Sequence, residues 1–251
     1  MKNLIVVTGG AGFVGSNLIS LFLKKTKYKI ISIDNYSSGN KKNHINNSRI
    51  KYINANTKNI FQTLKTKKNK IKTIFHLGEF ARIYQSFFKM NECIDSNSVG
   101  SHAVFNFCLT NKIKLIYSAT SASLGNKGRD KDLSPYAFTK AKNLELLENL
   151  KKWFKMKYEV IYFYNVYGPK QIFKGKMATV IGIFEDAYKN KKPLPVVKPG
   201  TQSRKFTHIY DTVNTCFYAW KKNKCRHYSI SSTKNLTILE VAKLFNYKIK
   251  F

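Results

Sequence analysis

Acidic residues are scarce in this chain of 251 residues: 13 Asp and Glu stand against 45 Lys and Arg, which gives a formal net charge of +32. An excess of this size would favour binding to nucleic acid or to an anionic membrane. The lysines, however, are spread over the whole chain among many Asn, Ile, Tyr and Phe residues, and no arginine-rich stripe or nucleic-acid motif is present. We therefore interpret the charge as background composition, and specific nucleic-acid binding is the weaker alternative.

Cysteines are few, and long apolar runs are absent. The four cysteines have no C-x-x-C spacing and, with five scattered histidines, form no zinc pattern, so no metal is predicted. No apolar run approaches the roughly 18 residues that span a bilayer, so no membrane segment is predicted. The hydrophobic content of 43% instead favours a globular fold. Reduced thiols are typical of a cytoplasmic protein.

What the sequence does have is an alternation of short apolar segments and longer helical patterns. Strands are predicted at 4–9, 29–34, 49–55, 72–78, 114–120 and 158–165, and helices at 12–24, 95–110 and 135–153. The first segment, LIVVTG, is almost continuously apolar, as in a parallel strand that is covered on both faces. Repeated strand–helix units of this kind predict an α/β fold with a doubly wound parallel sheet, the Rossmann architecture.

The regular alternation of strand and helix patterns ends after Asn165. Glycines and prolines break the rest of the chain into shorter pieces, with helical patterns at 211–222 and 237–245. We therefore expect a Rossmann domain over residues 1–165 and a smaller C-terminal lobe over residues 166–251.

A glycine-rich turn, TGGAGFVG, follows the first predicted strand and opens the first predicted helix. It contains Gly10-x-Gly12-x-x-Gly15, and counted from Gly9 it is also Gly9-x-x-Gly12-x-x-Gly15. The early glycines allow a tight turn and close approach of the backbone to a pyrophosphate, and Gly15 allows close packing of helix and strand. The helix N-terminus adds free N–H groups and a positive dipole. In this context the motif predicts a dinucleotide-binding site.

An acidic residue, Asp34, follows the second predicted strand at about the spacing of a ribose-binding acid. A carboxylate there accepts hydrogen bonds from the ribose hydroxyls and repels a 2′-phosphate. It therefore favours NAD over NADP. Asp34 could alternatively begin a simple polar turn, but the glycine-rich turn before it favours the cofactor interpretation.

Three polar side chains follow the later strands in an order that indicates catalysis. Tyr136 and Lys140 are one helical turn apart and share a face of the helix 135–153. A phenol loses its proton near pH ~10 in water, and a neighbouring ammonium and a bound NAD⁺ both stabilise the phenolate, which can then act as a general base. Thr120 lies at the end of the fifth strand, where doubly wound sheets bind ligands. Tyr-x-x-x-Lys also occurs by chance in amphipathic helices, but the glycine-rich turn and Asp34 favour the catalytic interpretation.

The sequence resembles the extended short-chain dehydrogenase/reductase family, and within it the NAD-dependent nucleotide-sugar epimerases and dehydratases. The resemblance extends over nearly all of the chain and is carried by the stretches TGGAGFVGSNL, DNYSSGN, FHLGEFARIYQSF, DSNSVGS, SPYAFTKAKN, YFYNVYGP and RKFTHIYDTV. It implies that Tyr136 is the base and that Thr120 shares a proton with the substrate hydroxyl. It also implies that Lys140 supports the phenolate and holds the nicotinamide ribose.

The resemblance further implies a set of ligand contacts. The cofactor-binding residues would be Gly9, Gly12, Phe13, Val14, Gly15, Asp34, Asn35, Asn56, Leu77 and Lys140, and the substrate-binding residues Thr120, Tyr136, Asn165 and Arg204. Asn56 stands where the family usually has an Asp near the adenine. Arg204 is expected to hold a diphosphate through paired, charged hydrogen bonds. Asn97 matches a family position near the cofactor, and His76 is expected to be structural.

The residues after Thr120 bear on the type of reaction. In this family an epimerase passes a hydride from the sugar to NAD⁺ and returns it to the other face of a 4-keto sugar, whereas a dehydratase also eliminates water. That elimination needs an acid and a base, usually an Asp-Glu pair directly after the strand-end Thr. Here Ser121 and Ala122 follow, and neither can transfer that proton. The resemblance therefore favours an epimerase.

The resemblance thus implies a cytoplasmic, NAD-dependent nucleotide-sugar 4-epimerase that acts on a UDP-hexose or UDP-N-acetylhexosamine for polysaccharide or glycan precursor synthesis. It implies a homodimer paired through helices such as 95–110 and 136–153. It also implies a substrate-binding lobe that is shorter than in the family, because the chain ends at Phe251. The alternatives are a dehydratase or reductase of the same family, and a truncated NAD-binding relative without activity.

Overall fold

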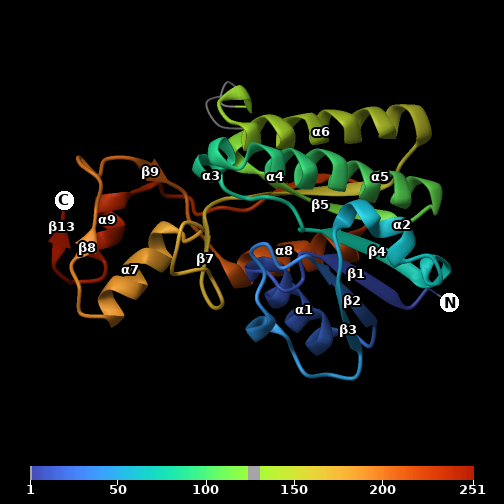
Figure 1. Cartoon of the computed structure of the whole chain (residues 1–251), viewed down its shortest axis with the longest axis horizontal. Coiled ribbons are helices and arrows are strands. Elements are labelled where there is room, and N and C mark those ends of the chain that lie inside the picture. The colour runs from blue at the N-terminus through green and yellow to red at the C-terminus, as the bar shows by residue number, and fades with distance from the viewer. Residues whose placement is uncertain (1, 124–130) are drawn as a thin grey trace.

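The computed structural model describes residues 2–123 and 131–251. Its framework is a sheet of seven parallel strands in the order β11-β6-β5-β4-β1-β2-β3 (Figure 1). These strands are β1 (Leu4–Thr8), β2 (Lys29–Asp34), β3 (Ile50–Asn54), β4 (Ile71–His76), β5 (Lys114–Thr120), β6 (Tyr158–Phe163) and β11 (His227–Ser229). The predicted doubly wound parallel sheet is confirmed, and each predicted strand forms close to its predicted bounds.

The order of the strands reverses between β1 and β4. The chain winds outward from β1 through β2 to β3, and then returns to β4 on the other side of β1. In an open parallel sheet, ligands bind outside the carboxyl ends of the strands at such a switch point. The glycine-rich turn after β1 and the ends of β4 and β5 meet at this place.

Helices cover both faces of the sheet, which explains why its strands are so apolar. One layer includes α2 (Ile60–Thr63), α5 (Ser101–Thr110) and α6 (Pro135–Phe154), and the other consists of α1 (Phe13–Lys25) and α8 (Ile209–Lys222). Along β1, Leu4 and Val6 pack toward the first layer, and Ile5 and Val7 pack toward the second. This is the alternation of a pleated strand.

The predicted helix over 95–110 begins earlier in the structure and is not uniform. It starts as α4 (Met90–Ile94), continues through a π-helical segment at Asp95–Gly100 and ends in α5. A shorter helix, α3 (Ile83–Phe88), precedes it. π-helical turns are rare and often occur at functional sites, and this one lies beside the first turns of α6.

The start of α6 is determined by local chemistry. Ser134 Oγ accepts a hydrogen bond from Ala137 N at 3.0 Å, as expected for an N-cap residue. Pro135 occupies the first turn, where its missing N–H removes no helical hydrogen bond. The first two turns of α6 carry Tyr136 and Lys140.

The smaller lobe has a core of its own. It contains α7 (Val180–Lys189), α9 (Ile238–Lys243) and two pairs of short strands, β8 (Leu194–Pro195) with β13 (Ile249–Lys250) and β9 (Ser203–Arg204) with β12 (Leu236–Thr237). Phe184, Leu194 and Val241 are buried between these elements. The lobe forms the left side of Figure 1, and two further short strands, β7 (Val166–Tyr167) and β10 (Thr207–His208), lie between it and the sheet.

Part of the chain after residue 166 lies with the sheet instead. α8 buries Ile209 and Val213 in the same apolar cluster as α1, because an amphipathic helix must cover its apolar stripe. β11 pairs with β6 and forms the edge of the sheet. α8 and β11 follow residue 166 in the sequence but pack with the Rossmann sheet. The division of the chain into two domains at residue 166 stays a prediction.

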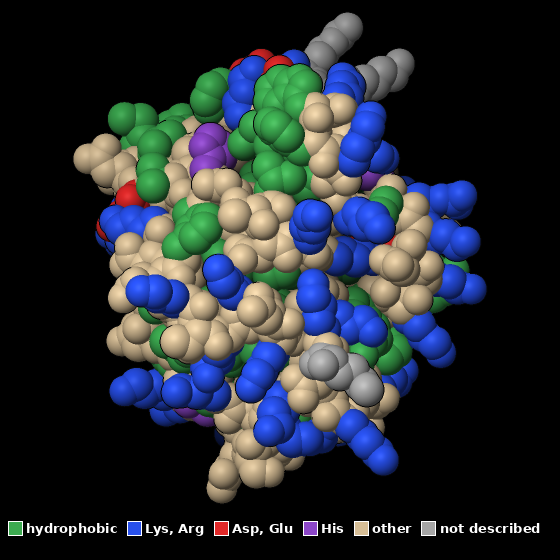
Figure 2. Space-filling model, turned by 90° about the vertical axis from the view of Figure 1, so that its right-hand side faces the viewer, with side chains coloured by type: hydrophobic (Ala, Val, Ile, Leu, Met, Phe, Trp, Pro, Cys, Tyr) green, Lys and Arg blue, Asp and Glu red, His purple; other side chains and the backbone are tan. Residues whose placement is uncertain are grey.

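Basic side chains are scattered over the surface that Figure 2 shows, which is the right-hand side of Figure 1. There, Lys and Arg alternate with polar and apolar side chains. No helix within residues 2–123 and 131–251 is long and apolar enough to cross a bilayer. The same residues contain no group of three His, Cys, Asp or Glu side chains that could hold a metal ion.

We expect Phe22→Ala to destabilise the fold strongly. Phe22 is completely buried on α1, and its ring lies 5.1 Å from that of Phe75 on β4 and 5.1 Å from that of Trp220 on α8. Loss of a buried Phe side chain costs about 3–5 kcal/mol of unfolding free energy. Urea unfolding measures this loss, with Leu244→Ala, at a side chain that is 75% exposed, as a control expected within about 0.5 kcal/mol of the parent. Equal effects of the two substitutions would contradict the assignment of Phe22 to the core.

Candidate functional site

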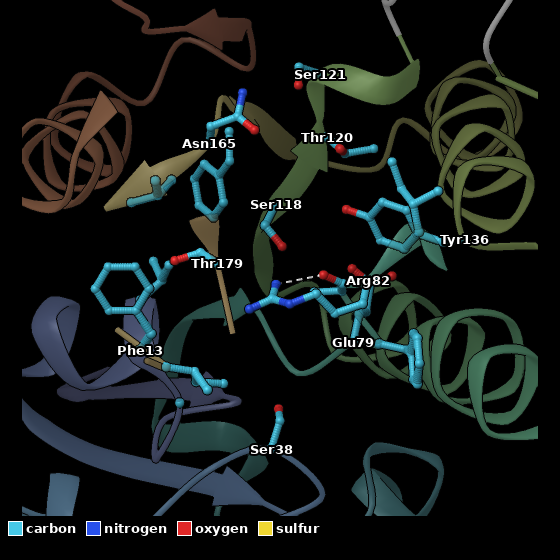
Figure 3. Close-up of a pocket in the computed structure, with 18 of the residues that line it drawn as sticks. Phe13, Ser38, Glu79, Arg82, Ser118, Thr120, Ser121, Tyr136, Asn165 and Thr179 are labelled. Atoms are coloured by element: carbon cyan, nitrogen blue, oxygen red, sulfur yellow. Dashed lines mark hydrogen bonds between the residues drawn. The ribbon is translucent and has the colours of Figure 1, made fainter. Parts of the chain in front are cut away.

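A cavity of about 1430 Å³ lies at the switch point, between the sheet and the smaller lobe. The glycine-rich turn, the ends of β2, β4 and β5, and the start of α6 line it on the sheet side. Segments around Asn165, Thr179 and Arg204 line it on the opposite side (Figure 3). The volume exceeds the roughly 300–1,000 Å³ of a typical small-molecule site, so the cavity has room for a cofactor and a substrate together.

The glycine-rich turn needs glycine at two positions for steric reasons. Gly9 has φ +69°, and a Cβ there would lie 2.8 Å from the backbone of Leu77 and Gly78. A Cβ on Gly15 would collide with the carbonyl oxygen of Gly9. These contacts hold α1 close against β1 and β4, as predicted from the motif.

Gly12 has a different task. A Cβ there would touch only the carbonyl oxygen of Gly9, at 3.1 Å, and Gly12 lines the cavity. Gly12 is also the N-cap of α1, and no side chain of the described residues caps that end. The N–H groups of the first turn of α1 are thus available to an anion, which fits the pyrophosphate of a dinucleotide.

Asp34 lies at the end of β2, where it lines the cavity and is 7% exposed. Its carboxylate accepts hydrogen bonds from Ala11 N and Tyr36 N, each at 2.9 Å. Burial raises the pKa of Asp34, and these backbone hydrogen bonds oppose that effect. The carboxylate is therefore held in one orientation beside the glycine-rich turn, where the adenosine ribose of a dinucleotide is expected.

Most of the other predicted cofactor contacts line the same part of the cavity: Phe13, Val14, Asn35 and Leu77. Asn56 does not. Its side chain accepts a hydrogen bond from Lys58 N at 3.0 Å, although its neighbours Ala55 and Thr57 do line the cavity. An Asn56 contact with the cofactor therefore stays a prediction.

The structure brings Thr120, Tyr136 and Lys140 together at the edge of the cavity. Thr120 is the last residue of β5 and is 9% exposed, and Tyr136 is also 9% exposed. Figure 3 shows the Tyr136 hydroxyl pointing into the cavity from α6. A phenol, a hydroxyl and a cation thus line one space, as expected for a site that removes a proton from a bound alcohol.

Lys140 has a partner that the sequence did not indicate. Its ammonium donates to the Glu79 carboxylate and to the carbonyl oxygen of Ser118, and the Lys140 and Glu79 side chains are 5% and 2% exposed. The second carboxylate oxygen of Glu79 accepts hydrogen bonds from Ser101 Oγ at 2.7 Å, Tyr117 OH at 3.0 Å and Asn143 Nδ2 at 3.0 Å. Burial is the largest effect and opposes ionisation of Glu79, but the charge of Lys140 and the hydrogen bonds to the carboxylate together outweigh it and hold the pKa of Glu79 below its usual value.

His76 is structural in its contacts, as expected. It is completely buried at the end of β4, with Nδ1 at 2.7 Å from Thr8 Oγ1 and Nε2 at 2.9 Å from Ser101 Oγ. Burial lowers the pKa of His76 to about 4. Since Ser101 also donates to Glu79, a chain of buried polar groups joins Lys140 to the end of β1.

The opposite side of the cavity carries the predicted substrate contacts. Asn165 has φ +35° and donates from Nδ2 to the carbonyl oxygen of Lys205 at 2.9 Å, and exposed Arg204 lies on β9. Both line the cavity. Asn97 does not line it: Oδ1 of its buried amide accepts a hydrogen bond from Phe80 N at 2.6 Å and supports the turn after β4.

Sequence reasoning missed Arg82 as well as Glu79. Arg82 lies just before α3, lines the cavity, and bonds the carbonyl oxygens of Ala81 and Met177. Both residues stand in the stretch FHLGEFARIYQSF, directly after the fourth strand. Two charged residues so close to the end of a predicted buried strand could have indicated that Glu79 and Arg82 belong to the site.

Residues 5–231 match the model of the NAD dependent epimerase/dehydratase family. The chain belongs to this family.

Its relatives include both epimerases and dehydratases. The chain is 28% identical to the ADP-L-glycero-D-manno-heptose-6-epimerase of Brachyspira hyodysenteriae, over 96% of this chain and 79% of the relative. It is 25% identical to a putative UDP-glucose 4-epimerase of Methanocaldococcus jannaschii, over 99% of this chain and 83% of the relative. Among solved structures, a UDP-N-acetylglucosamine 4-epimerase of Methanobrevibacter ruminantium is 26% identical and has a TM-score of 0.86, over 97% of this chain and 81% of that chain.

Membership of the epimerase/dehydratase family confirms the predicted resemblance and the predicted cofactor, NAD. The site fits that cofactor. Gly12 and the uncapped start of α1 would hold its pyrophosphate, and the Asp34 carboxylate would accept hydrogen bonds from its ribose.

The stability of the protein should depend on pH through His76. Its folded-state pKa of about 4 lies below the ordinary value of 6.5, so below pH 6.5 the unfolded chain binds a proton that the folded chain excludes. Stability should therefore fall by about 3 kcal/mol between pH 6.5 and 4. Urea unfolding of the parent and of His76→Gln across this range tests it, because the variant lacks this contribution. Parallel stability curves would contradict the prediction.

We expect Glu79→Gln to lower the unfolding free energy by about 3 kcal/mol or more, because it leaves a buried ammonium unpaired. The double variant with Lys140→Met should lose less than the sum of the two single losses. Glu145→Gln is a matched control, since the Lys142–Glu145 pair is exposed and its loss should leave the unfolding free energy nearly unchanged. Additive losses in the cycle would show that the buried pair is not coupled.

Proposed function

We propose that this protein is an NAD-dependent nucleotide-sugar 4-epimerase that acts on a UDP-hexose or a UDP-N-acetylhexosamine through a transient 4-keto sugar. The family includes epimerases and dehydratases, and two of the similar proteins named above are described as 4-epimerases. At about 25% identity, these similarities leave the choice between the two reactions to the residues of the site.

The observation that carries the proposal is the distribution of carboxylates in the cavity. Among the described residues that line it, Asp34 and Glu79 are the two with a carboxylate. Asp34 lies beside the glycine-rich turn, where the ribose of the cofactor is expected. Glu79 forms a buried ion pair with Lys140. Ser121 stands next to Thr120, and residues 2–123 and 131–251 place no acid–base pair for the elimination of water beside the strand end. Reversible oxidation of a hydroxyl does not need this additional acid–base pair.

The chemistry then divides among three side chains. Tyr136 Oη takes the proton of the sugar hydroxyl as that carbon is oxidised and gives it back when the carbon is reduced. Thr120 holds the same hydroxyl in place from the end of β5. Lys140, held by Glu79 and Ser118, stabilises the phenolate form and the ribose side of the site. NAD, when bound, takes up the hydride and returns it, so that no cofactor is consumed.

On the far side of the cavity, Asn165 and Arg204 are proposed to hold the substrate. Arg204 is charged, and no carboxylate of the described residues lies within ion-pair distance of it. A guanidinium suits a diphosphate, because its N–H groups match paired oxygen atoms. The sugar would then lie between Arg204 and Tyr136.

We also propose a homodimer and a cytoplasmic location. Several apolar side chains stay exposed on α3, α4 and the π-helical segment: Ile83, Tyr84, Phe87, Phe88, Met90, Ile94 and Val99. A contiguous apolar surface on one side of a protein often marks an interface. A second copy of the chain would cover it, close to the predicted pairing through 95–110.

Proton NMR of the purified protein with NAD and a panel of UDP-sugars tests the proposed activity. We expect a product with inverted configuration at C4, seen in the H4 coupling, with no net formation of NADH. Tyr136→Phe should abolish turnover, with a loss of at least about a hundredfold, because the general base is removed. It should leave NAD binding nearly intact, which fluorescence titration measures.

The other outcomes are equally specific. A 4-keto-6-deoxy product would identify a dehydratase and would contradict the argument from Ser121. An undiminished rate in Tyr136→Phe would contradict the proposed base. Absence of any product, with NAD bound, would support a relative without activity.

A further inference from the structure

Arg82 extends a positive charge into the sugar side of the cavity. It precedes α3 and is partly buried, and Figure 3 shows its guanidinium beyond Glu79, in the space toward which the Tyr136 hydroxyl points. Its Nε and Nη2 donate to the carbonyl oxygen of Met177 at 2.9 and 2.7 Å, and its Nη1 donates to the carbonyl oxygen of Ala81 at 2.8 Å. The backbone on both sides of the cavity thus holds this guanidinium in place.

These contacts leave part of the guanidinium without a partner. An arginine has five N–H bonds, and the three contacts use one on each nitrogen. The two that remain, one on each terminal nitrogen, have no acceptor among residues 2–123 and 131–251. No carboxylate in these ranges forms an ion pair with Arg82 either.

The other cation of this region already has its counter-charge. Lys140 is neutralised by Glu79 in a buried pair, so Arg82 is the cation near Tyr136 that has no carboxylate partner among the described residues. Burial lowers the pKa of Arg82, and the nearby Tyr136 opposes this effect. A partly desolvated cation without a counter-ion is costly until an anion binds.

The location of Arg82 indicates which part of a substrate that anion belongs to. Tyr136 marks the sugar carbon that reacts, whereas Arg204 and Lys205 project from the lobe and suit the diphosphate. A negative group held by Arg82 would therefore belong to the sugar itself. A carboxylate offers two oxygens in one plane, which match one N–H on each terminal nitrogen of a guanidinium.

We infer that Arg82 forms a subsite for a carboxylate carried by the sugar, and that the preferred substrate is a nucleotide-activated hexuronic acid. The inference rests on the proposed function. It specifies that the sugar of the proposed substrate is a hexuronic acid. A neutral hydroxymethyl group at the same place would leave the Arg82 charge uncompensated.

Isothermal titration of the NAD-loaded protein with UDP-glucuronate and with UDP-glucose tests the inference. Both ligands share the nucleotide and the diphosphate, so the ratio of their affinities reports the contact with the carboxylate. We expect UDP-glucuronate to bind at least roughly tenfold more tightly. In Arg82→Gln this ratio should fall to near one, and in Arg82→Lys it should be intermediate, because a lysine keeps the charge but not the paired geometry.

The ratio also separates the subsite from a structural role. If Arg82 acted only through its contact with Met177, Arg82→Gln would weaken the binding of both ligands equally. The ratio of their affinities would then be unchanged. Arg204→Gln is the matched control, since a diphosphate contact is common to both ligands and its loss should preserve the preference.

Equal affinities in the parent protein, a preference for UDP-glucose, no binding of either ligand, or a preference that survives Arg82→Gln would each overturn the inference. Turnover is measured separately. A preference for UDP-glucuronate without C4 inversion would support the subsite and contradict the proposed epimerase.

Discussion

Lys140 and Glu79 form an ion pair that is almost completely withdrawn from water, and the geometry of the site depends on it. Either charge alone would be very costly there, so the elements that bring them together must stay in register. Glu79 comes from the turn after β4, Lys140 comes from α6, and Ser101, which donates to Glu79, comes from α5. The pair therefore attaches the helix that carries Tyr136 to the carboxyl edge of the sheet by charge as well as by packing.

This pair also determines how charge is distributed in the cavity. Because Glu79 neutralises Lys140, the remaining charges that the described lining residues carry lie apart: a carboxylate, Asp34, beside the glycine-rich turn, and cations from Arg82 and from the smaller lobe. A dinucleotide offers ribose hydroxyls to the first end, and a nucleotide sugar offers anionic groups to the second. The net charge of +32 contributes little to this discrimination, since exposed lysines are screened by salt.

The parts of the site that sequence could predict are those with local geometry. Gly9, Gly12 and Gly15 belong to one strand–turn–helix unit, and Tyr136 and Lys140 belong to two turns of one helix, so spacing alone relates their positions. Glu79 and Arg82 could not be predicted in this way. Glu79 is 61 residues from Lys140, and a charged residue in an irregular turn has no periodic pattern that reveals its partner. Asn97 matches a family position near the cofactor by resemblance; its amide supports the turn at Phe80, and its place near the cofactor stays a prediction.

By itself the sequence determined the alternation of strands and helices, the glycine-rich turn before the first helix and the acid at the end of the second strand, because each depends on residues close together along the chain. Only the tertiary structure decided that α8 and β11 return to the sheet, that Lys140 is paired with Glu79, and that Arg82 lines the same cavity as Tyr136. The physical reason is the same in each case. Burial of apolar stripes and neutralisation of buried charges act between distant segments, and the choice of partner is made only when the sheet and its helices pack together.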